Sequence, residues 1–356
     1  MFPDIFNSDA FSLATLTTLI NQEEHIPGLA GNLAFAGVGE GVATTEIAVE
    51  ISNETLSLVQ TSARGGPSPV NTADKNTLKA LTIPHIKLEE TIGAHQIQGV
   101  REFGSMSQLR GARSVVDKEI RKQTRRMDLT VEHLRLGALQ GHVLDADGTT
   151  SLADLFALFN VSETVIDFNP VFDGGTGAPT FESIRTLCQE VTRGMKRALK
   201  AEIPGARIYC FAGDNFFDKL IECTNIKGIW DGWFMAEQRL AGNYAWGDYL
   251  FADIVFNNYQ GTNDQTRTTA GKVGVDPNTA RFFFTNVPGL YEEYYAPADF
   301  METVNTIGLP RYAKVGVDPS GMNRFVNLHT QMNPLPICTK PATLFKGTST
   351  LSTGDF

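Results

Sequence analysis

Cysteine is scarce in this sequence, which contains four such residues among 356. They are widely scattered and form no Cys-x-x-Cys pair, so the sequence predicts neither a disulfide framework nor a zinc site. We expect all four to be reduced thiols in the protein interior: Cys188, Cys210, Cys223 and Cys338.

Long apolar runs are also missing, since no window reaches the roughly 18 uninterrupted apolar residues that a membrane-spanning helix needs. The first four residues, Met-Phe-Pro-Asp, lack the basic region of a secretory signal. We therefore expect a protein that is made in the cytoplasm, stays there and has no membrane partner.

Common catalytic signatures are absent as well. The sequence has no Gly-x-Ser-x-Gly nucleophile turn, no phosphate loop ending in Gly-Lys-Ser or Gly-Lys-Thr, and no His-Glu-x-x-His. The glycines at 37–41 follow no good strand and open no helix, which favours a loop over a dinucleotide site. Residues 145–148, Asp-Ala-Asp-Gly, resemble the start of a calcium loop, but Phe156 occupies the position that needs a bidentate glutamate. We therefore expect no cofactor and no metal.

The densest polar and aromatic cluster is Tyr-Glu-Glu-Tyr-Tyr at 291–295. Glu292 and Glu293 could provide paired carboxylates for acid–base catalysis, whereas packing in a loop or an interface is the simpler interpretation. The six histidines are scattered, which favours surface or satisfied interior positions over a catalytic base.

The composition is that of a globular protein. Apolar residues make up 42% of the chain, charged residues 20%, and Phe occurs 23 times, so a wholly disordered or fibrous chain is excluded. The length allows two compact domains or one large irregular one. The net charge of −10 argues against a surface built throughout to bind nucleic acid, but it leaves room for a local basic strip.

The N-terminal part does not have the pattern of a compact domain. Residues 21–41 are rich in loop-forming residues around Ile-Pro-Gly-Leu at 26–29, which is typical of an arm that lies on another surface. Partly alternating apolar and polar runs at 45–59 and around 78–88 flank Arg-Gly-Gly-Pro at 64–67, which predicts a two-stranded β-ribbon with a Gly/Pro tip. Such a ribbon has two open edges, so we expect it to need a partner.

The clearest element is a helix at residues 105–141, along which apolar residues recur with a mean step of about 3.6. They are Leu109, Ala112, Val116, Ile120, Met127, Val131, Leu134 and Ala138. Four cations fall on the other side of the helix: Lys118, Arg121, Lys122 and Arg125. Like charges four residues apart destabilise an isolated helix by about a few tenths of a kcal/mol per pair. The strip either faces a polyanion or an acidic neighbouring subunit, or is simply a solvated face.

Downstream, Asp147-Gly148 predicts a hairpin turn within 143–149 because this pair readily adopts positive φ. A helix from about 181 to 200 and a short helix at 215–223 are expected on the basis of their apolar faces and caps. Strands are expected at 207–212, 249–259, 281–286, 312–317, 325–330 and 335–344. This mixture lacks the regular β-α-β alternation of a doubly wound sheet.

Several short strings stand in order along the chain. They are Ile-Pro-Gly-Leu at 26–29, Arg-Gly-Gly at 64–66, Leu-Gln-Gly at 139–141, Val-Leu-Asp-Ala-Asp-Gly at 143–148, Ala-Gly-Asp-Asn-Phe-Phe-Asp at 212–218, Val-Asn-Thr-Ile-Gly-Leu-Pro at 304–310 and Asn-Pro-Leu-Pro-Ile-Cys at 333–338. Their order and spacing resemble the major capsid proteins of tailed bacteriophages, specifically the family of the lambda-type major capsid protein E. The resemblance covers nearly the full length.

The resemblance implies an α+β protein with the Hong Kong 97-type capsid fold. This fold has an N-terminal arm, an extended loop formed by the ribbon, a peripheral domain built on a long spine helix, and an axial domain at the capsomer centre. The expected parts are the arm at 1–44, the extended loop at 45–92, the peripheral domain at 93–180 with the spine helix at about 105–141, the axial domain at 181–300, and return strands with the C-terminal tail at 301–356.

The resemblance also implies a structural protein, not an enzyme, that assembles into hexamers and pentamers of an icosahedral head around double-stranded DNA. Its expected location is the virion capsid, assembled in the host cytoplasm. The expected partners are other copies of the chain, packaged DNA bound non-specifically, scaffolding and portal proteins and, as an option, a decoration protein. Residues 1–9 give no sign of a long cleavable scaffolding segment, so we expect a separate scaffolding protein.

Two sites follow from the resemblance. The ribbon tip is expected to contact a neighbouring subunit through Arg64, Gly65, Gly66 and Pro67. The inner face of the spine helix is expected to face DNA through Lys118, Arg121, Lys122 and Arg125. Two alternatives stay open: the shell of a protein nanocompartment around enzyme cargo, and a soluble hydrolase that uses Glu292 and Glu293.

Overall fold

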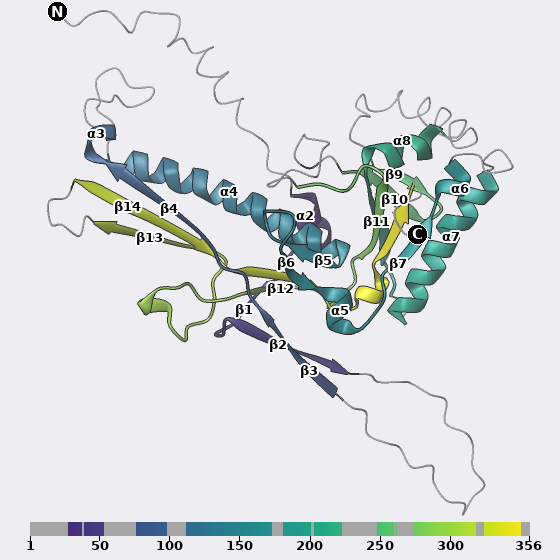
Figure 1. Cartoon of the computed structure of the whole chain (residues 1–356), viewed down its shortest axis with the longest axis horizontal. Coiled ribbons are helices and arrows are strands. Elements are labelled where there is room, and N and C mark those ends of the chain that lie inside the picture. The colour runs from purple at the N-terminus through teal and green to yellow at the C-terminus, as the bar shows by residue number, and fades with distance from the viewer. Residues whose placement is uncertain are drawn as a thin grey trace, which may run out of the picture.

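The computed structural model describes residues 28–37, 39–52, 76–97, 112–172, 181–200, 203–222, 248–259, 261, 273–317 and 324–349. Figure 1 shows three parts. A six-stranded sheet with helices around it lies at one end, and a long helix runs along a three-stranded sheet at the other. A two-stranded ribbon projects from the region between them.

The largest sheet has the strand order β7-β16-β11-β8-β10-β9. Its strands are β7 (Thr164–Asp167), β16 (Phe345–Thr348), β11 (Thr279–Thr285), β8 (Arg207–Ala212), β10 (Ile254–Asn258) and β9 (Tyr249–Phe251). β8 is parallel to β10 and antiparallel to β11. The sheet therefore mixes directions and is not the all-parallel sheet of a doubly wound fold.

Helices and phenylalanines build the core around this sheet. The helices are α6 (Asn169–Phe172), α7 (Phe181–Leu199) and α8 (Asp214–Glu222). α7 buries Ile184, Val191 and Met195, as its sequence pattern predicted. Among the described residues, six phenylalanine side chains are fully buried: Phe168, Phe211, Phe216, Phe256, Phe282 and Phe283. These rings give the six-stranded sheet an aromatic core.

The long helix α4 (Ala112–Gln140) packs on the second sheet. That sheet is antiparallel, with the order β13-β14-β4, and its strands are β13 (Tyr312–Val317), β14 (Phe325–Met332) and β4 (Ile86–Gly93). The short α3 (Ala94–Ile97) follows β4. Met127 and Val131 of α4 are buried against Met332 of β14. The predicted helix is therefore present, and its first residues, 105–111, lie outside the described residues.

A third sheet lies near the C-terminal half of α4, with the order β1-β12-β15. Its strands are β1 (Glu40–Gly41), β12 (Tyr291–Tyr295) and β15 (Pro334–Cys338). The short helix α2 (Leu29–Ala34) precedes β1 in the chain and packs on α4. Segments far apart in sequence thus converge on α4.

Gly141 ends α4 with a φ of 83°. The next residues form the predicted hairpin, β5 (His142–Leu144) and β6 (Ser151–Asp154), with Gly148 at a φ of 72° in its turn. The short α5 (Leu155–Phe159) then begins, and the Asp154 carboxylate accepts a hydrogen bond from the Ala157 amide as its N-cap.

The ribbon consists of β2 (Glu46–Ser52) and β3 (Asn76–Thr82), which pair antiparallel. The second alternating run does not continue as one strand: β3 ends at Thr82, and β4 begins at Ile86 in a different sheet. Pro84 stands between them, where its missing N–H interrupts a strand ladder. The tip residues Arg64, Gly65, Gly66 and Pro67 lie outside the described residues.

Two predicted strands are shorter than expected. The run 249–259 is a β9–β10 hairpin, because Ala252 and Asp253 adopt positive φ and reverse the chain. The run 335–344 ends as a strand at Cys338 and continues as the 3₁₀ turn η4 (Pro341–Thr343). A further 3₁₀ turn, η3 (Met301–Thr303), lies between β12 and β13.

The cysteines Cys188, Cys210 and Cys338 are free and buried, as predicted, while Cys223 lies outside the described residues. Burial raises the pKa of Cys188 and of Cys338 to about 12, which keeps both thiols protonated.

In the part of the chain that the structure describes, no three His, Cys, Asp or Glu side chains come together as a metal site. Across the same residues, every helix is too short or too polar to cross a bilayer.

Candidate functional site: the faces of helix α4

The apolar stripe of α4 is buried where the structure describes it. Met127, Val131, Leu134 and Ala138 expose between 0 and 4% of their surface. Towards its C-terminal end α4 is enclosed on more than one side, since Leu136 and Leu139 are buried as well. α4 is therefore anchored at its C-terminal end.

Gln123 is a polar residue inside this stripe and is 2% exposed. Its side-chain oxygen accepts a hydrogen bond of 2.7 Å from Thr330 Oγ1 on β14. Its amide nitrogen donates to Glu90 Oε2 on β4 at 3.3 Å. Both polar ends of the amide are thus satisfied, which fixes α4 in one register on the sheet.

Glu132 joins α4 to α2 and is 1% exposed. Its two carboxylate oxygens accept hydrogen bonds from the backbone amides of Ala30 (2.7 Å) and Gly31 (3.1 Å), and Tyr259 Oη donates to it at 3.3 Å. Burial raises the pKa of this carboxyl, although the two backbone amides and the Arg135 guanidinium act in the opposite direction. The carboxylate supplies acceptors for two amides in the first turn of α2.

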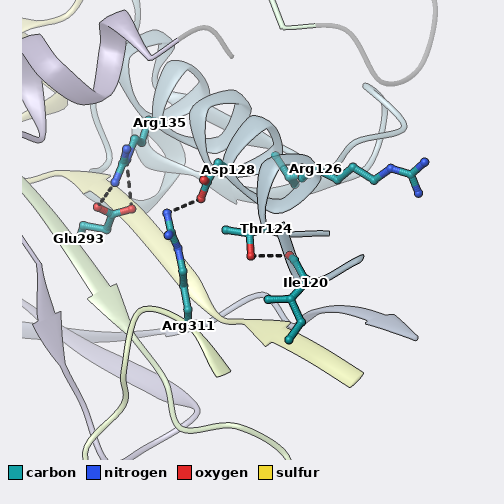
Figure 2. Close-up of polar contacts among 8 residues, drawn as sticks. Ile120, Thr124, Arg126, Asp128, Arg135, Glu293 and Arg311 are labelled. Atoms are coloured by element: carbon teal, nitrogen blue, oxygen red, sulfur yellow. Dashed lines mark hydrogen bonds and ion pairs between the residues drawn. The ribbon is translucent and has the colours of Figure 1, made fainter. Parts of the chain in front are cut away.

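Two ion pairs link α4 to segments downstream (Figure 2). Arg135 forms a bidentate pair with Glu293 of β12, and Arg311 Nη2 lies 2.6 Å from Asp128 Oδ1. The Glu293 side chain is fully buried, whereas 58% of the Arg311 side chain is exposed. Loss of Arg135 would therefore leave the Glu293 carboxylate buried without its cation. Loss of the Arg311–Asp128 pair would leave charges that water can reach.

The hydrolase alternative finds no support in this geometry. Glu292 accepts a hydrogen bond from Tyr294 Oη, while Glu293 is paired with Arg135. Neighbouring residues in a strand point to opposite faces, so the two carboxylates do not form an acid–base pair. A cavity of about 540 Å³ beside α4 is lined by Asp128, Glu132 and Arg135, among others, but each of these already has a partner.

The basic strip lies on the other side of α4 from this network, as its sequence spacing predicted. Lys118, Arg121, Lys122 and Arg125 are all exposed. Lys122 Nζ lies 2.9 Å from Glu119 Oε2 and 3.8 Å from Glu90 Oε1, so part of the positive charge is neutralised within the subunit. In Figure 2 the neighbouring Arg126 extends away from the Asp128–Arg311 pair. Lys122 thus reaches towards β4, while Lys118, Arg121 and Arg125 are exposed on the surface of α4.

Lys79 links the ribbon to α5, and Leu81, Ile47 and Val49 of the ribbon pack in or against the main core. The Lys79 ammonium donates hydrogen bonds to the carbonyls of Ala157 and Leu158, near the end of α5. A cation is favourable at this position because the helix C-terminus carries partial negative charge.

Comparison with known proteins places this architecture in context. The phage major capsid protein E family matches residues 12–349. The chain is 25% identical to the major capsid protein of Salmonella phage Felix O1, over 94% of this chain and 95% of the relative. It is 22% identical to the major capsid protein of Pseudomonas phage KPP10, over 95% and 96%.

Among solved structures, a capsid protein from an Escherichia coli CFT073 prophage superposes with a TM-score of 0.52 at 12% identity. The match covers 95% of this chain and 98% of that one. This likeness confirms the predicted α+β capsid fold.

Proposed function

The chain belongs to the phage major capsid protein E family and is the major capsid protein of a phage shell, and from this premise we propose that it forms hexamers and pentamers of an icosahedral head around double-stranded DNA. The virion capsid is its location, and we propose that assembly takes place in the host cytoplasm. We infer a structural role with no catalytic activity.

The observation that best supports this proposal is the two-stranded ribbon β2–β3. It is a two-stranded sheet with both outer edges unpaired among the described residues, and Leu78 on β3 is 69% exposed. A two-stranded ribbon is marginally stable by itself, and open edges with exposed apolar residues need cover. Neighbouring copies of the chain would provide this cover, and the tip at Arg64, Gly65, Gly66 and Pro67 would take part in that contact.

The proposal extends to domain organisation and partners. We propose the arm at 1–44, the extended loop at 45–92, the peripheral domain at 93–180, the axial domain at 181–300 and the return strands at 301–356. DNA would be bound without sequence preference through Lys118, Arg121, Lys122 and Arg125, because phosphate contacts depend on charge and not on base identity. Scaffolding, portal and optional decoration proteins would be separate chains.

Electron microscopy and native mass measurement of the purified full chain test this function, with and without a scaffolding partner. Closed shells with five-fold and six-fold capsomers are expected, and DNA-filled heads are expected from infected cells. A compact monomer under every condition would contradict shell formation. Shells that assemble without scaffold and enclose an enzyme in place of DNA would favour the nanocompartment alternative.

A variant in which residues 62–69 are replaced by a short Gly-Ser turn tests the ribbon contact. The subunit is expected to fold with an unchanged unfolding midpoint, while shells become fewer or melt at lower temperature because a contact between subunits is lost. Normal particles with normal heat stability would show that the tip does not hold subunits together.

A further inference from the structure

An exposed apolar loop joins β12 to β13 at residues 299–311. Four large apolar side chains in it are largely exposed: Met301 (92%), Ile307 (69%), Val304 (59%) and Leu309 (55%). Single exposed apolar residues are ordinary on protein surfaces, whereas a group of them within one short segment marks an interaction surface. Figure 1 shows the loop standing out from the strands near β13.

Internal hydrogen bonds hold this loop in one conformation. Thr303 Oγ1 donates to the Ala298 carbonyl at 2.6 Å, and Thr306 Oγ1 donates to the Thr303 carbonyl at 2.8 Å. The Leu309 amide donates to Tyr312 Oη at 2.7 Å. A preorganised loop loses little conformational entropy when a partner covers it, which favours binding.

At Gly308 the loop packs closely against β12 and the end of β1. The Gly308 amide donates to the Val42 carbonyl at 2.9 Å. A Cβ on Gly308 would lie 1.9 Å from the Tyr295 carbonyl oxygen, and a Cβ on Gly41 would lie 2.2 Å from the Gly308 carbonyl oxygen. Backbone therefore packs directly on backbone here. Ile307 Cγ2 also lies close to Gly41, and Leu309 lines the cavity beside α4, yet each of these side chains remains more than half exposed.

Two ion pairs lie beside the loop, and Asp299 at its start is a further exposed acid. Lys314 Nζ lies 2.8 Å from Glu302 Oε1, and Arg311 Nη2 lies 2.6 Å from Asp128 Oδ1. The apolar group is thus bordered by two pairs whose charges cancel and by the single negative charge of Asp299, on a chain with a net charge of −10. Like copies that meet through a charged patch repel each other, whereas copies that meet through a neutral apolar patch do not.

An open strand edge continues the same surface. β13 is the outermost strand in the order β13-β14-β4, and Val315 on it is 48% exposed. Open edges with apolar residues are usually covered in the functional state of a protein.

We propose that the loop 299–311, together with the edge of β13, is a contact surface for a second copy of this chain. The proposal rests on the proposed function, because a shell surrounds every subunit with further copies of itself. An apolar centre with a polar rim is the anatomy of such a protein–protein contact.

The substitution Ile307→Ser tests the proposal, with Leu250→Ser on β9 as the matched control because Leu250 is 65% exposed. Neither change should alter subunit unfolding, since both side chains are mostly in solvent. Ile307→Ser is expected to raise the protein concentration needed for shell assembly by about tenfold, the effect of losing one well-buried apolar contact. Leu250→Ser is expected to leave that concentration within about twofold.

Equal assembly of the unchanged chain and the Ile307→Ser variant would overturn the proposal and leave the shell function intact. Absence of shells from the unchanged chain would overturn the proposed function itself. Normal Ile307→Ser shells that no longer bind a decoration protein would assign the loop to that other partner and also overturn the proposal.

Cross-linking gives an independent readout. Cys188, Cys210 and Cys338 are buried, so a Met301→Cys variant places a reactive thiol in the exposed loop. Treatment of assembled shells with a short bis-maleimide is expected to give covalently linked copies of the chain, and the unchanged chain treated in the same way is the control. Linked species no more abundant than in the control would contradict a copy-to-copy contact.

Discussion

Arg135 and Glu293 form two parallel hydrogen bonds between α4 and β12, although they stand 158 positions apart in the chain. Arg135 Nε lies 3.2 Å from Glu293 Oε1, and Nη2 lies 2.8 Å from Oε2. The planar guanidinium matches the carboxylate in a geometry that an ammonium cannot reproduce. This pair holds the third sheet to the long helix (Figure 2).

Arg135→Lys is therefore expected to lower the free energy of unfolding of the unassembled subunit by about 2–4 kcal/mol, because Glu293 stays buried with an incomplete partner. Chemical unfolding measures this loss. Arg311→Lys is the control, since its pair with Asp128 is exposed and should contribute less than about 1 kcal/mol. Equal losses at the two positions would show that burial of Glu293 does not set the energy of its pair.

Gly141 is required where α4 turns into β5. Its φ is 83°, and a Cβ there would lie 2.2 Å from the Phe156 ring. Gly141→Ala is expected to cost about 2–4 kcal/mol of unfolding free energy, from left-handed backbone strain and from displacement of a buried ring. Gly148→Ala is the control, because Gly148 has a φ of 72° but no atom within 4 Å of its Cβ position. Gly148→Ala should cost only about 1 kcal/mol, because it adds backbone strain without a steric clash. Thermal unfolding of both variants measures the additional cost of the clash at Gly141.

The sequence predicted the long helix well because the apolar period of α4 is a local signal. The sequence also contains a signal at Gln123, because the apolar step from Ile120 to Met127 is seven residues long and Gln123 stands between them. A polar residue within an apolar stripe indicates a buried hydrogen bond, but its partner Thr330 lies 207 positions away and has no local signature. Glu132 and Arg135 were missed for the same reason.

Strand pairing was harder to predict than strand existence. Alternation shows which face of a strand is buried, but it does not show which sheet the strand joins. The run at 78–88 therefore looked like one ribbon strand, although Pro84 divides it between two sheets. The exposed loop 299–311 gave no sequence signal, because apolar residues in a loop look the same whether they point into the core or away from it.

Glu132 gives a prediction on pH dependence. Its carboxyl has a pKa raised above 4.5 by burial, so its contribution to stability is fully present below that pH and is lost as the pH rises through the folded-state value. Glu132→Gln removes this titration. The destabilisation caused by Glu132→Gln is therefore expected to be larger near pH 4.5 than at pH 7, as measured by chemical unfolding across that range.

Glu119→Gln is the control with the opposite sign. Burial raises the pKa of Glu119, but the hydrogen bond and charge of Lys122 outweigh it and lower the pKa. Its contribution is present above the unfolded value and lost as the pH falls, so Glu119→Gln should destabilise the subunit more at pH 7 than under acid conditions. A Glu132→Gln effect that also grows towards neutral pH would mean that the Ala30 and Gly31 amides outweigh burial.

The basic strip gives the prediction that bears most directly on the proposed genome contact. Arg121→Gln with Arg125→Gln removes two exposed positive charges per subunit and relieves an unfavourable pair four residues apart. Chemical unfolding of the unassembled variant measures any change in the stability of α4, because Arg125 also has an interaction of its own. Arg193→Gln with Arg197→Gln on α7 is the matched control, since it removes the same charges at the same spacing from another exposed helix face.

Empty shells of both double variants are expected to assemble as the unchanged chain does. Full heads of the Arg121/Arg125 variant should package less DNA or release it at lower temperature, because each neutralised phosphate contributes a salt-dependent attraction that is repeated over every subunit. Heads of the Arg193/Arg197 control should keep their DNA. The measurement is nuclease-protected DNA per particle during a heating series at two salt concentrations. If empty shells of the Arg121/Arg125 variant fail as badly as full ones, the partner of the strip is an acidic surface of the adjacent subunit and not the genome.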